Sequence, residues 1–391
     1  PSQYNKTCPD RVPVQPPDKS DTMSMSRNEW VLASVAIILT TAISLLLVRW
    51  LAPQLLGVPV DLQLVQTSKS LPPFYAGVFR EEDALTGGML LNDPHTNTRF
   101  TPLLPADSGT GPHDVLGFRN SAVPNSPRIV VIGDSQTYGV GEPLEDNWPS
   151  PLQAMSNPQD AVYSMAVGGW GGAQYLYMFD KATRLKPRVV IIAFYSGNDA
   201  LDSFATAYGN PHWQDLMINA ALDKGDTPQL ASMLAVDDAW PVTFSDGSKL
   251  ALTPVGRLAV NDREQAAVTT GYAIMAEVAR RITAQASTHD ISVVFTTIPT
   301  RELVFAARVA QEALEAPASY TRLIAMEQEN IDELAGRIGA LPGAHYVDLV
   351  KPLQAAALVN GALYPRLWDG HPGKQGYRVI ATTLATAIND L

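Results

Sequence analysis

The sequence has almost no cysteine: the only one among 391 residues is Cys8, close to the N-terminal end. This excludes a disulfide within the chain, a zinc site built from cysteines and a cysteine nucleophile in the main part of the chain. Charge is also scarce. Charged residues make up 17% of the chain, and 28 Lys and Arg face 39 Asp and Glu. Because the resulting net charge of −11 repels phosphate backbones, we expect no nucleic-acid partner.

Charge is absent from one long apolar run, Trp30–Val48, which holds 19 residues. At about 1.5 Å per residue, a helix of this length approaches the roughly 30 Å of a bilayer's hydrocarbon core. Trp30 and Trp50 stand at its ends, where indole rings favour the headgroup region. A buried core helix would show a polar face, and a cleaved signal peptide would have a cleavage site where Arg49-Trp50 stands. We therefore predict a transmembrane helix within residues 30–52, preceded by a flexible, Pro-rich tail (1–29).

The rest of the chain divides at Arg128. Residues 53–127 are rich in Pro, Gly and Asn and predict a linker with an irregular segment leading into the main domain. Short apolar runs then alternate with stretches of helical periodicity. The runs are Ile129–Ile132, Ala161–Met165, Val189–Tyr195, Ile291–Ile298 and His345–Leu349. This alternation predicts an α/β fold, three layers with a parallel five-stranded sheet, over residues 128–391.

The alternation lapses between residues 200 and 262, which we interpret as an insertion beside the mouth of the sheet. It carries a predicted hairpin about Asp246-Gly247 and seven acidic groups, which disfavour a polyanionic substrate. Its aromatic residues are Phe204, Tyr208, Trp213, Trp240 and Phe244. Two interpretations stay open: the rings pack inward as a small satellite core, or the segment forms a wall of a substrate cleft.

Chemically useful residues follow the predicted strands, where sites form in open parallel sheets. Gly133-Asp134-Ser135 follows the first strand and exposes a serine on a tight turn, and a Gly-rich turn (166–172) follows the second. Asn198 offers a carboxamide after the third, and Asp369-Gly370-His371 precedes the last predicted helix. No Lys follows the glycines in the spacing of a phosphate-binding loop. The remaining histidines are scattered, so we expect surface or capping roles for them and no metal site; they are His95, His113, His212, His289 and His345.

These blocks, in this order, resemble the SGNH or GDSL hydrolase family over roughly residues 128–391. The resemblance implies Ser135 as nucleophile, His371 and Asp369 as its partners in a triad, and an oxyanion hole formed by Ser135, Gly169 and Asn198. The final block here spaces Asp and His by one residue where the family commonly has two, and Ser164 stands where the second block often has Asn. The run Ile298-Pro299-Thr300-Arg301-Glu302 is similar to a Pro-Thr-Lys motif of alginate O-acetyltransferase-like relatives.

The predicted function is a membrane-anchored serine esterase or O-acyltransferase for acyl esters, with acetyl esters of glycans as a candidate substrate. A serine hydroxyl is a weak nucleophile, so it needs a base such as His371, and no cofactor is required. An anchored enzyme of envelope glycans places the tail in the cytoplasm and residues 53–391 outside. The alternative is a non-catalytic subunit that uses the same fold within a larger membrane complex. The intact set of Ser135, Asn198 and His371 favours the enzyme.

Overall fold

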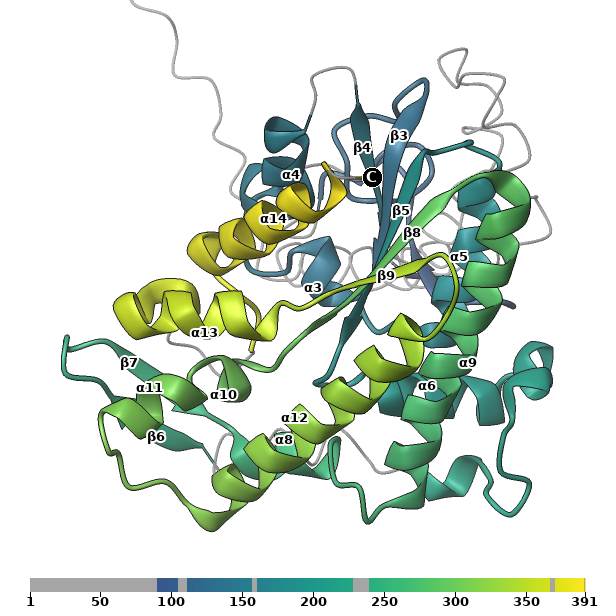
Figure 1. Cartoon of the computed structure of the whole chain (residues 1–391). Helices are drawn as coiled ribbons and strands as arrows, with labels where there is room; N and C mark the ends of the chain where they lie inside the picture. Colours follow the sequence, from purple (N-terminus) through teal and green to yellow (C-terminus); the bar gives the residue numbers. More distant parts are fainter. Residues whose placement is uncertain (1–89, 105–110, 157–159, 228–238, 366–369, 390) are drawn as a thin grey trace, which may run out of the picture. The chain divides into compact units, whose positions relative to one another are not determined.

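The computed structural model describes residues 90–104, 111–156, 160–227, 239–365, 370–389 and 391 (Figure 1). The predicted transmembrane helix and Asp369 lie outside these ranges. Within them, no helix has the length and apolar character needed to cross a bilayer.

Five parallel strands form the central sheet, in the order β4-β3-β5-β8-β9. Their bounds are β3 Pro127–Gly133, β4 Ala161–Ala166, β5 Val189–Tyr195, β8 Ser292–Ile298 and β9 Ala344–Val347. Each of the five predicted apolar runs therefore forms a strand. Because both faces of such a sheet are covered, these strands can be apolar at every position, as β5 is, with all of its residues buried.

Helices cover both faces of the sheet (Figure 1). One face carries α5 (Gly172–Thr183), α6 (Asp199–Gly209) and α9 (Ala266–His289). The other carries α4 (Pro149–Met155), α13 (Val350–Val359) and α14 (Lys374–Ile388). Successive residues of a strand serve opposite cores: Val130 and Val190 belong to the first, whereas Val131 and Ile191 belong to the second. The predicted three-layer α/β fold is confirmed.

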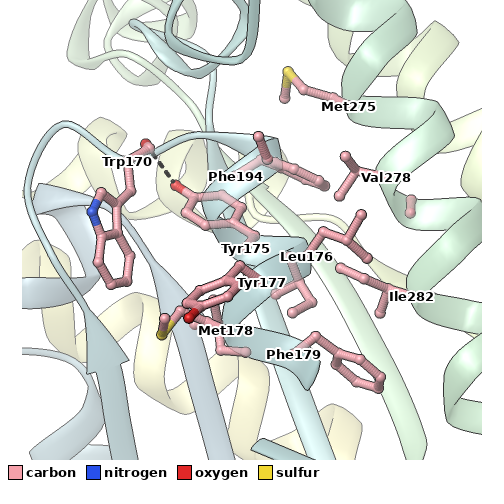
Figure 2. Close-up of a cluster of buried hydrophobic side chains, with 14 of the residues drawn as sticks. Trp170, Tyr175, Leu176, Tyr177, Met178, Phe179, Phe194, Met275, Val278 and Ile282 are labelled. Atoms are coloured by element: carbon pink, nitrogen blue, oxygen red, sulfur yellow. Dashed lines mark hydrogen bonds between the residues drawn. The ribbon is translucent and has the colours of Figure 1, made fainter. Parts of the chain in front are cut away.

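The first core is dense in aromatic rings (Figure 2). Side chains of α5 such as Tyr175 and Phe179 pack between the sheet and α9. The Tyr175 hydroxyl oxygen lies 3.3 Å from the backbone oxygen of Trp170. Because Trp170 belongs to the Gly-rich turn, this core anchors a loop at the carboxyl edge of the sheet.

The remaining elements border the sheet. They are α3 (Ser135–Tyr138), α8 (Pro254–Ala259), α10 (Arg301–Val304), α11 (Ala306–Gln311), α12 (Ala318–Gly339) and the 3₁₀ turns η4 (Leu144–Asp146), η5 (Pro211–Leu216), η6 (Lys224–Asp226) and η8 (Gly361–Leu363). The predicted hairpin forms from β6 (Trp240–Thr243) and β7 (Lys249–Leu252). A second hairpin, β1 (Leu90–Asp93) with β2 (Asn97–Phe100), lies in the segment that sequence composition predicted to be irregular.

The insertion begins differently from the prediction, because α6 is a core helix of the first layer. Phe204 and Trp213 join the first core and Phe244 joins the second, all three being buried. Trp240 packs its ring against Tyr320, with centroids 4.9 Å apart. The rings pack inward, as one of the two interpretations expected, but they extend the two main cores and do not form a satellite core of their own.

Candidate active site

The turn after β3 places a serine at the start of a helix. Asp134 caps α3, since its side chain accepts the backbone N–H of Gln136 at 2.9 Å. A Cβ on Gly133 would lie 2.1 Å from the Thr137 hydroxyl oxygen, so only glycine lets the strand turn this closely into the helix. Ser135, the first residue of α3, is half-buried just beyond the carboxyl end of β3.

The C-terminal block brings a histidine to this serine. His371 Nε2 lies 2.9 Å from Ser135 Oγ, across 236 residues of sequence. The Ser135 hydroxyl also lies 3.3 Å from Asp134 Oδ2. A hydroxyl has one proton to donate, and the shorter distance favours donation to the imidazole. The geometry is that of a nucleophile with a general base in reach.

A buried carboxylate faces this pair. Asp134 is fully buried, and burial raises its pKa to about 6, while the positive charge that His371 can carry lowers it. Above about pH 6, Asp134 therefore holds a negative charge beside Ser135 and His371. Sequence reasoning treated Asp134 only as part of the turn. The sequence Gly133-Asp134-Ser135 could have indicated this role, because it places a carboxyl group directly before the candidate nucleophile.

The Gly-rich turn lies against the serine. A Cβ on Gly168 would lie 3.5 Å from Ser135 Cβ, and Gly169 adopts φ +78°, a conformation that glycine adopts readily. The loop is held from outside as well, since the Trp170 indole N–H donates to the backbone oxygen of Thr98 in β2 at 2.7 Å. The β1–β2 hairpin thus supports a loop beside the nucleophile.

Asn198 follows β5, a strand that pairs directly with β3, and stands at the N-terminus of α6. Its Nδ2 donates to Asp202 Oδ2 at 2.5 Å. Burial raises the pKa of Asp202 to about 7, and the bond from Asn198 opposes this rise. Asp199 is completely buried and accepts the Tyr175 hydroxyl at 2.8 Å, and burial raises its pKa well above the ordinary range. The charge of Asp134 raises the pKa of both carboxyls further.

The insertion supplies a cation to the same edge. Arg257 on α8 is buried, and its guanidinium donates to the backbone oxygen of Gly197 at 3.0 Å. A Cβ on Gly370 would lie 2.8 Å from the same guanidinium. Arg257 therefore contacts the residue before Asn198 and lies beside the residue before His371. Sequence reasoning missed it, because nothing in the pattern of residues 200–262 singles out this arginine.

The segment before the domain also contributes to the site. Arg119 donates to the backbone oxygens of Gly139 at 2.6 Å and Glu142 at 2.8 Å, just after the nucleophile helix. His113 Nε2 lies 2.7 Å from the hydroxyl of Tyr138, the last residue of α3. His113 is only 4% exposed, so of the two roles expected for it, surface or capping, the surface role was wrong. Both contacts fix the far end of the turn that carries Ser135.

The run Ile298-Pro299-Thr300-Arg301-Glu302, which is similar to the Pro-Thr-Lys motif, lies in the protein interior. Thr300 caps α10 and donates its hydroxyl to Glu327 Oε2 at 2.6 Å. Arg301 and Glu302 are both buried and form an ion pair at 3.6 Å. These contacts give the run a packing role. Within the described ranges, no group of three or more His, Cys, Asp or Glu side chains is arranged to hold a metal ion.

A comparison with protein families gives the relationship. The model of the GDSL-like lipase/acylhydrolase family matches residues 131–379, which is more than half of the chain. The chain belongs to the GDSL-like lipase/acylhydrolase family. The match begins in β3 and ends within α14, so it contains Ser135, Gly169, Asn198 and His371. The resemblance predicted from the sequence blocks is confirmed for the family.

The search of curated proteins gave no match. Among solved structures, the chain is similar to a putative lipolytic protein of the G-D-S-L family from Desulfitobacterium hafniense. The two are 16% identical with a TM-score of 0.35, and the similarity covers 66% of this chain and 97% of that one. A psychrotrophic esterase from Pseudoalteromonas sp. shows 12% identity, a TM-score of 0.37 and coverage of 68% and 98%. A catalytic mutant of an acetylxylan esterase from Geobacillus stearothermophilus shows 12% identity, a TM-score of 0.35 and coverage of 66% and 93%.

Proposed function

We propose that the chain is a serine esterase or O-acyltransferase for short acyl esters, in the first place acetyl esters of glycans. The observation that supports this most directly is the 2.9 Å contact between Ser135 Oγ and His371 Nε2 in a chain of the acylhydrolase family. A non-catalytic subunit would have no need to keep a nucleophile and a base at this distance, beside a buried carboxylate and a Gly-rich loop.

In the proposed reaction, His371 Nε2 takes the proton of Ser135 as Oγ attacks the acyl carbon. The oxygen of the tetrahedral intermediate is stabilised by the backbone N–H groups of Ser135 and Gly169 and by the Asn198 carboxamide. The imidazolium then gives its proton to the departing alcohol, which leaves an acyl-serine. A water molecule or a glycan hydroxyl, deprotonated by the same imidazole, releases the acyl group and restores Ser135.

Two carboxylates have roles in this proposal. Asp369, in the position that the family's last block suggests, orients the other nitrogen of His371. Asp134 supplies a second negative charge that stabilises the imidazolium, since its pKa of about 6 leaves it ionised at neutral pH.

The activity test compares single variants of the full chain, purified in detergent, on p-nitrophenyl acetate. S135A should lower kcat/KM by roughly 10³-fold or more, because the nucleophile is lost. S287A is the matched control: Ser287 is exposed on α9, where its hydroxyl bonds only a backbone oxygen of its own helix. Activity retained in S135A would contradict the proposed mechanism. Adding an oligosaccharide acceptor then separates transfer from hydrolysis by the acetylated product.

We further propose that residues 30–48 anchor the chain in a membrane, with the catalytic domain outside the cytoplasm. The support is the uncharged run of 19 residues between two tryptophans. Protease added to intact spheroplasts should remove the chain beyond about residue 53. Release of the protein by washing without detergent, or protection of the domain from protease, would contradict the anchor.

A further inference from the structure

Asn198 occupies a helix N-terminus without capping it. An asparagine at this position ordinarily accepts a backbone N–H of the first turn through its side-chain oxygen. Asn210 does so one element later, accepting the N–H of His212 at 2.9 Å. Asn198 makes no such bond, and its buried Oδ1 has no hydrogen-bond partner among the described residues. Its orientation is therefore set by another contact.

That contact is the bond from Asn198 Nδ2 to Asp202. Asn198 directly precedes α6, and Asp202 lies four residues later in the first turn of that helix, a spacing at which the two side chains can meet. The backbone N–H of Asp202 donates to the backbone oxygen of Asn198 at 3.0 Å, and the side chains are joined by the 2.5 Å bond from Asn198 Nδ2 to Asp202 Oδ2. The next residue, Ser203, accepts the N–H of Gly172 at 2.8 Å, which ties the same turn to the Gly-rich loop.

A carboxylate selects one of the two orientations of a carboxamide. In its ionised form the Asp202 carboxylate only accepts hydrogen bonds, so it binds the NH₂ end of Asn198 and repels its side-chain oxygen. The NH₂ group has two protons, and Asp202 takes one of them. No acceptor in the described part of the chain takes the second N–H, which can therefore donate to another group.

We propose that Asp202 is a positioning residue of the oxyanion hole: by binding one N–H of Asn198, it holds the carboxamide with its second N–H available to the developing oxyanion. This inference rests on the proposed function, because it needs Asn198 to act as an oxyanion donor. It assigns to Asp202 an effect on turnover that passes entirely through Asn198.

The test is a double-mutant cycle on p-nitrophenyl acetate with D202A, N198A and the double variant. Loss of an oxyanion donor typically lowers kcat by about 10²–10³-fold, which sets the expected effect of N198A. D202A should lower kcat about 10-fold with little change in KM, since the ground-state ester does not use the donor fully. In the N198A background, D202A should change kcat less than about 2-fold.

Two further variants separate positioning from general stability. D202N should keep at least about half of the wild-type kcat, because an asparagine oxygen accepts the same N–H. D180A is the matched control, as Asp180 is exposed on α5, outside the site, with an ion pair to Arg184 of only 4.0 Å. It should leave kcat unchanged. If D202A fails to fold, D202S takes its place in the double-mutant cycle, because the shorter serine side chain also removes the carboxylate that accepts from Asn198 Nδ2.

Equal losses from D202A in both backgrounds would overturn the inference, because the effect would not pass through Asn198. A D202N variant as slow as N198A, or a D202A variant as fast as wild type, would overturn it too. In each of these cases an active wild type and an inactive S135A leave the proposed function standing. A wild type without esterase activity would overturn both proposals together.

Discussion

Replacement of Gly271 by alanine should weaken the contact between α9 and α6. A Cβ at this position would lie 1.9 Å from the backbone oxygen of Ala200 and 2.5 Å from its carbonyl carbon. Backbone atoms cannot rotate away as a side chain can, so α6 has to move. Overpacking of this kind destabilises by roughly 1–3 kcal/mol, and the clash with backbone places G271A at the upper end. The gain in helix propensity, about 1 kcal/mol, offsets part of this, which leaves a net loss of ~2 kcal/mol.

Gly336 on α12 provides a matched control, since it is an exposed helical glycine and a Cβ there would meet no atom within 4 Å. G336A should therefore stabilise the protein by up to about 1 kcal/mol through propensity alone. The assay is the melting temperature of each variant, in which 1 kcal/mol corresponds to roughly 1–2 °C for a chain of this length. G271A should also lower kcat, because Ala200 lies two residues after Asn198, whereas G336A should not. A melting temperature of G271A equal to or above that of G336A would refute the reasoning.

Three further outcomes are expected. Burial raises the pKa of Glu327 from 4.5 to about 7, so its stabilising contribution is full below pH 4.5 and is lost, by ~3 kcal/mol, as the pH rises through 7. The melting temperature of E327Q should therefore rise relative to that of wild type between pH 5 and pH 8. A difference between the two melting temperatures that does not change with pH would contradict the assignment. R257M removes the guanidinium that donates to the Gly197 oxygen, so it should lower the free energy of unfolding by ~1–3 kcal/mol. It should also lower kcat on p-nitrophenyl acetate, and an unchanged kcat would show that Arg257 does not support the site. W170F removes the indole N–H that donates to the Thr98 oxygen, so amide hydrogen exchange in residues 90–100 should become faster. An unchanged exchange rate would show that other contacts alone hold the hairpin.

Local patterns were sufficient to predict the sheet. The run Val189–Tyr195 was apolar throughout and forms β5 with the same bounds, because a strand covered on both faces leaves a signal in every residue. The meeting of Ser135 with His371 was predicted from the resemblance to the SGNH or GDSL family, which implies that both residues belong to one triad; the 2.9 Å contact agrees with it.

Contacts that depend on distant side chains left no such signal. Arg119 and His113 reach the nucleophile turn from a segment whose composition is that of a loop. Arg257 reaches two site loops from a six-residue helix within the insertion, and any arginine there would have had the same sequence context. The bond between Asn198 and Asp202 is local, but an i,i+4 pair of this type is ordinarily a minor helix-stabilising contact. The bond gains a functional role only if Asn198 is also a donor to the oxyanion.

The central claim, that Ser135 is a nucleophile activated by His371, is tested most directly by a fluorophosphonate probe followed by mass spectrometry of the labelled peptide. The account predicts a single adduct on Ser135 in the wild type. It also predicts that labelling slows by about 10³-fold or more in H371A, because a hydroxyl without its base is a poor nucleophile. An adduct on another residue, or an equal labelling rate in H371A, would contradict it.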